Sequence, residues 1–244
     1  MSESVHPPLV VSGLVKSYRR ATVLRGLDLS AMPGEAVAVV GSNGAGKSTL
    51  LGCITGDRLP DSGSIRICGW DPFSDPARAA GCMGFVPEQP FLYPELTVGE
   101  MLRFVAEARQ MKERAATDEI LRLQDLLDLT GAESALCREL SQGMGRKVGI
   151  IAALLHRPRL LLLDEAFNGL DRSSSERLSG ELQARRDAGA AVVLSSHDLM
   201  FLAEWCDRGI LLAPGQPSLA LQGEIWKRWK QAPTLDPKVA SGGT

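Results

Sequence analysis

Residues 41–49 combine three glycines with a lysine and three hydroxyl side chains. They read Gly-Ser-Asn-Gly-Ala-Gly-Lys-Ser-Thr and match the pattern G-x-x-x-x-G-K-[ST]. Backbone N–H groups can converge on an anion only where no Cβ intervenes, and a helix that starts there adds partial positive charge. The stretch therefore predicts a phosphate-binding loop.

Two side chains of this loop have specific expected roles. Lys47 is expected to reach the β- and γ-phosphates of a nucleotide, and Ser48 to bind Mg²⁺. The residues expected to contact the nucleotide are Ser42, Asn43, Gly44, Ala45, Gly46, Lys47, Ser48 and Thr49. The alternative, a glycine-rich loop that binds nothing, fits poorly with the strand and helix expected on either side.

Two adjacent carboxylates form a second candidate group. Asp164 and Glu165 follow four consecutive leucines at residues 160–163. In open parallel sheets, ligands gather outside the carboxyl ends of the strands, so the pair is expected beside the phosphate loop. A hard cation keeps most of its waters and needs anionic oxygen nearby, which suits Asp164 as a holder of Mg²⁺. Glu165 is then free to orient the attacking water.

These side chains need strands and helices to bring them together. Uninterrupted apolar runs at residues 36–40, 160–163 and 190–194 each predict a strand buried on both faces of a parallel sheet. After the phosphate loop, a short helix is expected over residues 50–54, ended by Gly56. The loop thus has the strand-loop-helix context that its chemistry requires.

The remaining periodic segments predict two further structural units. Apolar and polar residues alternate over residues 9–15, 23–30 and 64–69, which is typical of antiparallel strands. Amphipathic helices are expected over residues 97–110 and 118–129. The predicted fold is α/β: a P-loop NTPase core with a parallel sheet, an N-terminal antiparallel β subdomain and an inserted α-helical subdomain.

Composition excludes several classes of protein. The chain has 244 residues, 44% of them hydrophobic, and a formal net charge of −2, which gives no overall reason to expect nucleic acid. Its five cysteines include no C-x-x-C pair and suit buried, reduced thiols. No N-terminal signal peptide and no membrane span are expected, because neither kind of apolar segment is present.

Three more motifs follow in a fixed order. Residues 140–144 read Leu-Ser-Gln-Gly-Met, residues 168–171 read Asn-Gly-Leu-Asp, and residues 195–198 read Ser-Ser-His-Asp. Together with the loop and the carboxylates, they resemble the nucleotide-binding subunits of ATP-binding cassette (ABC) transporters across about residues 9–222. The resemblance implies ATP as the nucleotide and Mg²⁺ as its cofactor.

The resemblance also implies roles for individual residues. Tyr18 falls where an aromatic ring stacks on adenine, and His197 falls where a histidine contacts the γ-phosphate. The implied catalytic residues are Glu165, His197 and Lys47.

Residues 140–144 correspond to the signature sequence of the family, a glycine-containing turn that opens a helix expected over residues 145–155. Such a turn builds a second anion site. In the family, this site grips the γ-phosphate of ATP bound to the opposing subunit, which implies that Ser141 and Gly143 act on a second copy.

Three departures from the family pattern change what can be expected. Residues 84–97 resemble the segment that senses Mg²⁺-ATP and touches the membrane partner, but the usual glutamine aligns with Glu88, while Gln89 lies one position on. Either residue could meet the metal. The signature has Gln142 for its commonest glycine and Met144 for its closing glutamine, a form associated with exporter-type subunits. Ala166-Phe167 replaces the usual Pro-Thr and removes no reactive group.

The implied organisation is one ABC ATPase domain over residues 9–222, with the helical subdomain inserted at about residues 85–155. Residues 223–244 are expected to form a C-terminal helix and a loose tail. Within them, the Trp-Lys-Arg-Trp-Lys run at residues 226–230 is interpreted as a solvated helix with two packing tryptophans.

The implied function is an ATP-hydrolysing subunit that dimerises on ATP, as a homodimer or a heterodimer, and drives a separately encoded membrane permease for export. The permease is expected to dock near residues 91–96, which places the subunit in the cytoplasm, peripheral on the cytoplasmic face of the membrane. No nucleic acid is expected as a partner.

Two alternatives to this function are considered. One is a soluble cassette ATPase in DNA repair or translation, against which the chain shows no second cassette and no long heptad insertion between Lys47 and Ser141. The other is a nucleotide switch that does not hydrolyse ATP.

Overall fold

The computed structural model describes residues 6–19 and 21–241. The other residues, 1–5, 20 and 242–244, lie outside the described residues; they include most of the N-terminal stretch examined for a signal peptide and the last part of the expected tail.

A six-stranded sheet forms the centre of the molecule, in the order β5-β6-β7-β3-β8-β9. All neighbours pair in parallel except β9, which runs antiparallel to β8. The strands are β3 (Ala36–Gly41), β5 (Met83–Val86), β6 (Leu160–Asp164), β7 (Ala191–Ser195), β8 (Arg208–Leu212) and β9 (Leu219–Leu221). Every residue of β3, β6 and β7 is buried, as their apolar runs predict.

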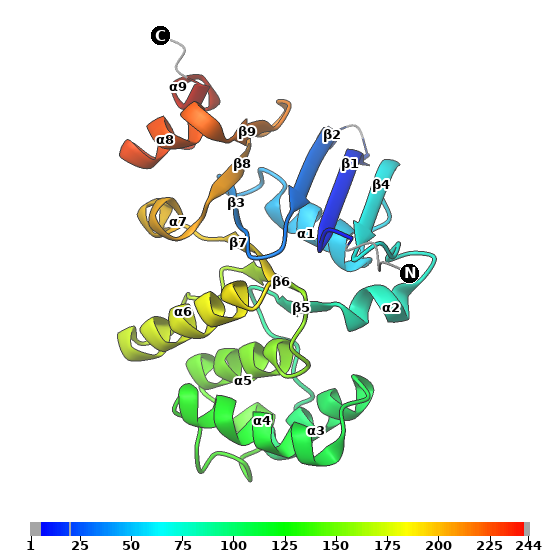
Figure 1. Ribbon diagram of the computed structural model, residues 1–244, viewed down its shortest axis with the longest axis vertical. Helices are drawn as coiled ribbons and strands as arrows, with labels where there is room; N and C mark the ends of the chain where they lie inside the picture. Colours follow the sequence, from blue (N-terminus) through cyan, green and yellow to red (C-terminus); the bar gives the residue numbers. More distant parts are fainter. Residues whose placement is uncertain (1–5, 20, 242–244) are drawn as a thin grey trace.

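A separate antiparallel sheet has the order β2-β1-β4 and contains β1 (Leu9–Tyr18), β2 (Ala21–Ala31) and β4 (Ser62–Ile67). Figure 1 shows it (blue to cyan) beside the helix that follows the phosphate loop. Its strands β1 and β2 are longer than the alternating segments in the sequence, because pairing continues through the polar residues as far as Tyr18 and Ala21.

The helices are α1 (Lys47–Thr55), α2 (Pro76–Gly81), α3 (Val98–Ala108), α4 (Glu113–Leu126), α5 (Gln142–Leu154), α6 (Arg172–Asp187), α7 (Leu199–Trp205), α8 (Gly223–Gln231) and α9 (Pro237–Ser241), with a 3-10 turn at Cys137–Glu139. Helices α3, α4 and α5 come between β5 and β6, which are neighbours in the sheet, and they form the lower part of Figure 1 (green). The expected fold is therefore confirmed, including the inserted helices.

Alternation along the buried strands divides the core into two layers. Ala36, Ala38 and Val40 of β3 face one side of the sheet and pack with apolar residues from α3 to α8. Val37 and Val39 face the other side and pack with the antiparallel sheet and α1. The strand ends that carry the candidate chemistry are thus held between two apolar layers.

Three segments differ from the sequence expectations. Helix α4 begins at Glu113, five residues earlier than the expected residue 118, because polar residues with good helix propensity extend it. Helix α6 was not expected, since Leu178 and Leu182 are its only buried leucines. The tail is not simply loose in its described part: α9 places Ala240 in the core, and Trp229 donates its indole N–H to the Thr234 carbonyl (2.9 Å).

Candidate functional site

The phosphate loop joins the end of β3 to the start of α1. Gly46, the residue that precedes the helix, has φ +109°, and a Cβ at this position would lie 2.8 Å from Val23 Cγ1. Glycine is therefore required there. No side chain caps this helix N-terminus, so its first N–H groups face the space in front of the loop without a capping acceptor from the chain. Lys47 Nζ donates to the Gly41 carbonyl at 2.7 Å.

A cavity of about 400 Å³ lies in front of the loop. Its lining combines the loop with residues from five other places in the chain: Tyr18, Val23, Ser42, Asn43, Gly44, Gly46, Lys47, Ser48, Thr49, Glu88, Asp164, Glu165 and His197. Most residues expected to contact the nucleotide or its metal therefore meet in one space. Ala45 is absent from this lining, because its side chain is 2% exposed and packs in the core under the antiparallel sheet.

Asp164, the last residue of β6, lies next to the loop hydroxyl. Ser48 Oγ donates to Asp164 Oδ2 at 3.4 Å, and Ser195 Oγ, from the end of β7, donates to Asp164 Oδ1 at 2.6 Å. Asp164 is 6% exposed, so its orientation is fixed by these partners. A hydroxyl and a carboxylate side by side are hard oxygen donors of the kind that Mg²⁺ prefers, and they fit such an ion.

Glu165 directly follows β6 and has φ +52°, an unusual conformation for a residue with a side chain. Its N–H donates to Ser195 Oγ at 3.2 Å. Its carboxylate Oε2 accepts from the His197 N–H (3.1 Å) and from Asn168 Nδ2 (3.1 Å). The residue is 3% exposed although it lines the cavity.

The other carboxylate oxygen of Glu165, Oε1, has no hydrogen-bond partner in the described part of the chain. His197 Nε2 lies 3.4 Å from it without forming a hydrogen bond, and the His197 side chain is 56% exposed. A buried carboxylate oxygen without a donor is suited to accept from a water molecule in the cavity. This arrangement can position a water and take its proton.

Arg146 of α5, which the sequence analysis did not single out, connects the site to the inserted helices. The residue is 4% exposed. Its Nη1 donates to the Glu165 carbonyl at 3.0 Å, and its Nη2 donates to the Glu88 carbonyl. One guanidinium thus holds the backbone on two sides of the cavity. Asn168 and Ser195 were quoted only as parts of motifs, and their contacts to Glu165 and Asp164 were not expected.

Glu88 and Gln89 point to different places. Glu88 lines the cavity in front of the phosphate loop, whereas Gln89 lines a neighbouring hollow of about 580 Å³ with Pro90, Phe91 and Leu92. The two side chains therefore line different hollows, and only one of them lines the cavity in front of the phosphate loop. That residue is Glu88.

The signature residues lie outside the cavity. Ser141 caps α5 by accepting from the Met144 N–H at 3.2 Å, and it is exposed. Gly143 packs against the segment after Glu165, since a Cβ on it would lie 3.1 Å from the Gly169 carbonyl. Neither Ser141 nor Gly143 is among the residues that line the cavity. The phosphate loop and the signature of one chain therefore do not share a site.

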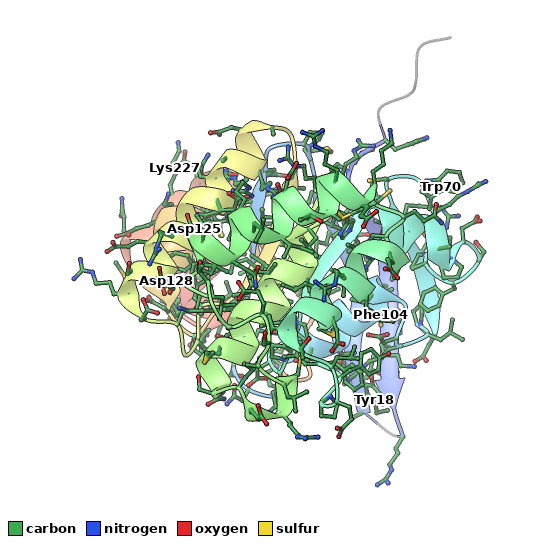
Figure 2. The ribbon with its side chains drawn as sticks, turned by 90° about the horizontal axis from the view of Figure 1, so that it is seen from below. Tyr18, Trp70, Phe104, Asp125, Asp128 and Lys227 are labelled. Carbon is green, nitrogen blue, oxygen red and sulfur yellow. The ribbon has the colours of Figure 1, made fainter. Side chains whose placement is uncertain are left out.

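Tyr18 stands at the end of β1, where Figure 2 shows its side chain at the edge of the molecule. It is 42% exposed and lines the cavity. Arg58 Nη1 donates to the tyrosine hydroxyl at 3.0 Å, and Lys16 Nζ lies 5.4 Å from the centre of the ring. The ring is thus held by its hydroxyl at the rim of the cavity, with its face available for stacking.

The described residues contain neither a helix suited to span a membrane nor a cluster of metal-binding side chains. None of the helices in residues 6–19 and 21–241 is both long enough and apolar enough to cross a membrane. Across the same residues, no three His, Cys, Asp or Glu side chains gather into a metal-binding group. A single carboxylate with a neighbouring hydroxyl, as at Asp164 and Ser48, still fits an ion that keeps most of its waters.

Comparison with known proteins identifies relatives for most of the chain. A family model described as ABC transporter matches residues 24–168. The SkfA peptide export ATP-binding protein SkfE of Bacillus subtilis is 34% identical over 206 residues, which cover 84% of this chain and 85% of the relative. The linearmycin resistance ATP-binding protein LnrL of the same organism is 31% identical over 208 residues, covering 85% of this chain and 67% of the relative.

Two solved structures share the fold and part of the sequence. A structure described as the ATP-binding subunit of an ABC transporter superimposes with a TM-score of 0.86 at 31% identity and covers 96% of this chain and 98% of its own. A bacterial ABC transporter cassette, described as dimeric, superimposes with a TM-score of 0.77 at 25% identity and covers 88% of this chain and 99% of its own.

Proposed function

The chain belongs to the ABC transporter family of ATP-binding proteins, and on this premise we propose that it is the ATP-hydrolysing subunit of an exporter whose membrane permease is a separate chain. The observation that carries the proposal is the cavity of about 400 Å³, which brings the phosphate loop together with Asp164, Glu165 and His197. Nucleotide binding follows from the family; the roles of individual residues are our proposal.

Each side chain of the cavity has a task in hydrolysis. Lys47 and the N–H groups at the start of α1 bind the β- and γ-phosphates of ATP. Glu165 orients a water and accepts its proton as the water oxygen attacks the γ-phosphorus, and the bond to the leaving ADP oxygen breaks. His197 contacts the γ-phosphate, and Tyr18 stacks on adenine.

Mg²⁺ fits the site through Ser48 and Asp164, whose oxygens lie 3.4 Å apart. When bound, the ion neutralises charge on the phosphates. Glu88 is the third residue that we assign to the metal, because it lines the cavity and Gln89 does not. Ser195 keeps the Asp164 carboxylate in place.

We propose that the working form contains two nucleotide-binding subunits arranged head to tail around two ATP molecules. The exposed Ser141 and the half-buried Gly143 of one copy complete the site built on the phosphate loop of the other. The dimeric description of one structural neighbour supports this arrangement. The second subunit is either another copy of this chain or a different nucleotide-binding subunit.

The permease has a suitable docking place in the hollow of about 580 Å³ beside the cavity. Phe91 is 77% exposed at its edge, and Tyr93 stacks edge to face with Phe91 and Phe104, with ring centres 5.5 Å apart in both pairs. Exposed aromatic residues around a hollow are typical of protein interfaces. The segment that forms the hollow also carries Glu88, so permease movement and nucleotide state are mechanically connected.

Export as the direction rests on the signature form and on relatives whose names describe peptide export and antibiotic resistance. Nothing in these relatives favours a role in DNA repair or translation. We place the ATPase domain at residues 9–222, its helical insertion at residues 85–155 and a C-terminal appendage at residues 223–244. The subunit then works at the cytoplasmic face of the membrane, where its permease is anchored.

The Lys47→Ala variant tests the proposed function. It removes the side chain assigned to the β- and γ-phosphates, so ATP binding and phosphate release are expected to fall together, by about a hundredfold for loss of a charge-assisted contact. Calorimetry and a phosphate-release assay measure the two quantities. Lys112→Ala, an exposed lysine before α4, is the matched control and is expected to leave both unchanged. Full activity in Lys47→Ala overturns the proposal.

A further inference from the structure

A second hollow, of about 610 Å³, lies at the opposite end of the central sheet from the nucleotide cavity. It is formed by α4, by α6 and by the segments that lead into β6 and β7, and α4 and α6 lie side by side there (Figure 2). Its ionisable lining residues are Arg122, Arg157, Arg159, Arg185 and Glu181. We call it the arginine hollow. The rest of its lining is proline, alanine and glycine, so no further carboxylate competes there.

Two carboxylates neutralise only part of this positive charge. Arg122 bonds to both Glu119 (3.0 Å) and Glu181 (2.7 Å), and Arg185 bonds to the same two carboxylates, each at 2.7 Å. Arg157 adds a third bond to Glu119 at 3.0 Å. Burial raises the pKa of Glu119, but hydrogen bonds from Arg122 and Arg157 outweigh it and lower the pKa to about 2, so the carboxylate stays ionised.

The balance leaves an excess of positive charge. Four guanidinium groups, counting Arg159, stand against two carboxylates, which leaves a net charge of two positive charges. The Arg157 side chain is 71% exposed and directs one nitrogen to Glu119, which leaves its other donors available. Arg159 uses one nitrogen for the His6 carbonyl at 3.1 Å.

Arg185 is a second observation in the arginine hollow, because one of its nitrogens lacks a hydrogen-bond acceptor. The residue is 8% exposed, and its Nε and Nη2 are bonded to Glu181 and Glu119. Its third nitrogen, Nη1, is buried and has no hydrogen-bond partner in the described part of the chain. Buried donors in folded proteins are almost always paired. One of the residues that line the arginine hollow therefore keeps a donor without an acceptor from the described chain.

We propose that the arginine hollow binds a multiply charged phosphate anion, with Arg157 and Arg159 as its donors. Planar guanidinium groups pair with phosphate oxygens through two parallel N–H bonds, which single-point cations do not do. A doubly charged phosphate balances the two positive charges that the carboxylates leave. The ligand class is a phosphate monoester or a small inorganic polyphosphate.

Binding at this place joins two parts of the fold. Arg122 and Glu119 belong to α4 of the inserted helices, whereas Arg185 belongs to α6, which follows β6. Arg157 and Arg159 lie in the connection from α5 to β6, and α5 is the helix that the signature opens. An anion bound to Arg157, which also bonds to Glu119 of α4, restrains the inserted helices, and with them the signature, against the core. The site is thus placed to adjust how readily the signature moves.

The test uses inorganic pyrophosphate at low ionic strength without added metal, in protein that carries Lys47→Ala to weaken binding at the phosphate loop. Calorimetry compares this protein with one that also carries Arg157→Gln and Arg159→Gln. The pair of changes is expected to weaken pyrophosphate binding about a hundredfold, about tenfold for each charge-assisted contact. The matched control adds Arg172→Gln and Lys227→Gln instead, at side chains 93% and 71% exposed, and should bind as before. Equal affinity in all three proteins overturns the proposal.

Hydrogen exchange supplies a second readout that does not depend on the arginine variants. Pyrophosphate is expected to slow exchange of the backbone amides of α4 and α6 in the Lys47→Ala protein, and unchanged exchange in both helices contradicts the bridging geometry.

Vesicles of phosphatidylcholine with and without phosphatidic acid distinguish the two sources of the anion. Vesicle binding that requires phosphatidic acid and is lost with Arg157→Gln and Arg159→Gln assigns a lipid headgroup. Binding of soluble pyrophosphate alone assigns a free phosphate.

Discussion

Two loops of this molecule precede helices and are suited to hold anions, yet their surroundings differ. The phosphate loop opens α1 with Gly46, has no side-chain cap, and faces a cavity that the same chain closes with Asp164, Glu165 and His197. The signature loop opens α5 with Ser141, whose hydroxyl caps the helix, and it is exposed outside that cavity.

On the proposed function, this difference means that one chain holds most of a reaction site and presents the remainder outward. The Ser48 hydroxyl of the phosphate loop lies within hydrogen-bond distance of Asp164, and Glu165 lines the same cavity. Ser141 and Gly143 are not among the residues that line it. The proposal therefore makes dimerisation a requirement of the chemistry.

The largest expected effect concerns the phosphate-loop side of this comparison. Glu165→Gln keeps the shape of the side chain but removes its ability to take a proton, so phosphate release should fall by about 10²–10⁴ while ATP still binds. Phosphate release and nucleotide affinity measure this. Glu176→Gln, at a side chain that is 66% exposed on α6, is the matched control. Unchanged release in Glu165→Gln removes the glutamate from the mechanism.

A smaller effect is expected at Arg146, which lies on α5, the helix that the signature loop opens, and contacts the backbone beside the nucleotide cavity. Its guanidinium holds the carbonyls of Glu165 and Glu88 without touching the cavity. In Arg146→Gln, kcat should fall by about tenfold while KM changes little, because the catalytic backbone shifts and the phosphate loop does not. Arg146→Lys, which can reach one carbonyl, should recover part of kcat.

Thermal unfolding separates positioning from stability at Arg146. Loss of a buried charged hydrogen-bond donor lowers the free energy of unfolding by about 1–3 kcal/mol, whichever role Arg146 has. If the variant is less stable but keeps the original kcat, Arg146 has only a structural role. That result contradicts a functional connection between the phosphate loop and the signature loop through Arg146.

The smallest expected effect lies at the adenine end of the cavity. Tyr18→Ala removes the ring and should raise KM for ATP about tenfold with kcat nearly unchanged, in line with about 1–2 kcal/mol of stacking. Tyr18→Phe keeps the ring and loses only the hydroxyl held by Arg58, so KM should rise less than threefold, about the worth of one exposed hydrogen bond. Equal KM values in steady-state kinetics for Tyr18→Ala and the unchanged protein exclude stacking by this ring.

Much of the site follows from local sequence because each part sits at the end of a recognisable strand. Lys47, Asp164 and His197 follow apolar runs that are buried in the structure, and the carboxyl ends of parallel strands meet at one edge. The choice between Glu88 and Gln89 required coordinates, since the two residues follow one another in a loop and line different hollows.

Other features have no local signal. Arg146 contacts Glu165 and Glu88, which are 19 and 58 positions away in the sequence. Ser195 contacts Asp164 across 31 positions. Hydrophobic periodicity predicts local structure and gives no information about contacts between such distant residues. Helix α6 escaped prediction because its buried side chains include Ser174 and Arg185, which pair with polar partners instead of forming an apolar stripe. The sequence gives no sign of the arginine hollow either, because its lining residues come from three separate segments of the chain.

The molar mass of the Glu165→Gln protein in solution tests the central claim most directly. Light scattering with Mg²⁺-ATP is expected to give twice the mass of one chain, and the mass of one chain without nucleotide. Adding Ser141→Arg should keep the protein at the mass of one chain while calorimetry still detects ATP binding, which also shows that the variant is folded. A protein that binds ATP and stays single in Glu165→Gln, or a dimer that persists with Ser141→Arg, contradicts a site completed by the signature of a second copy.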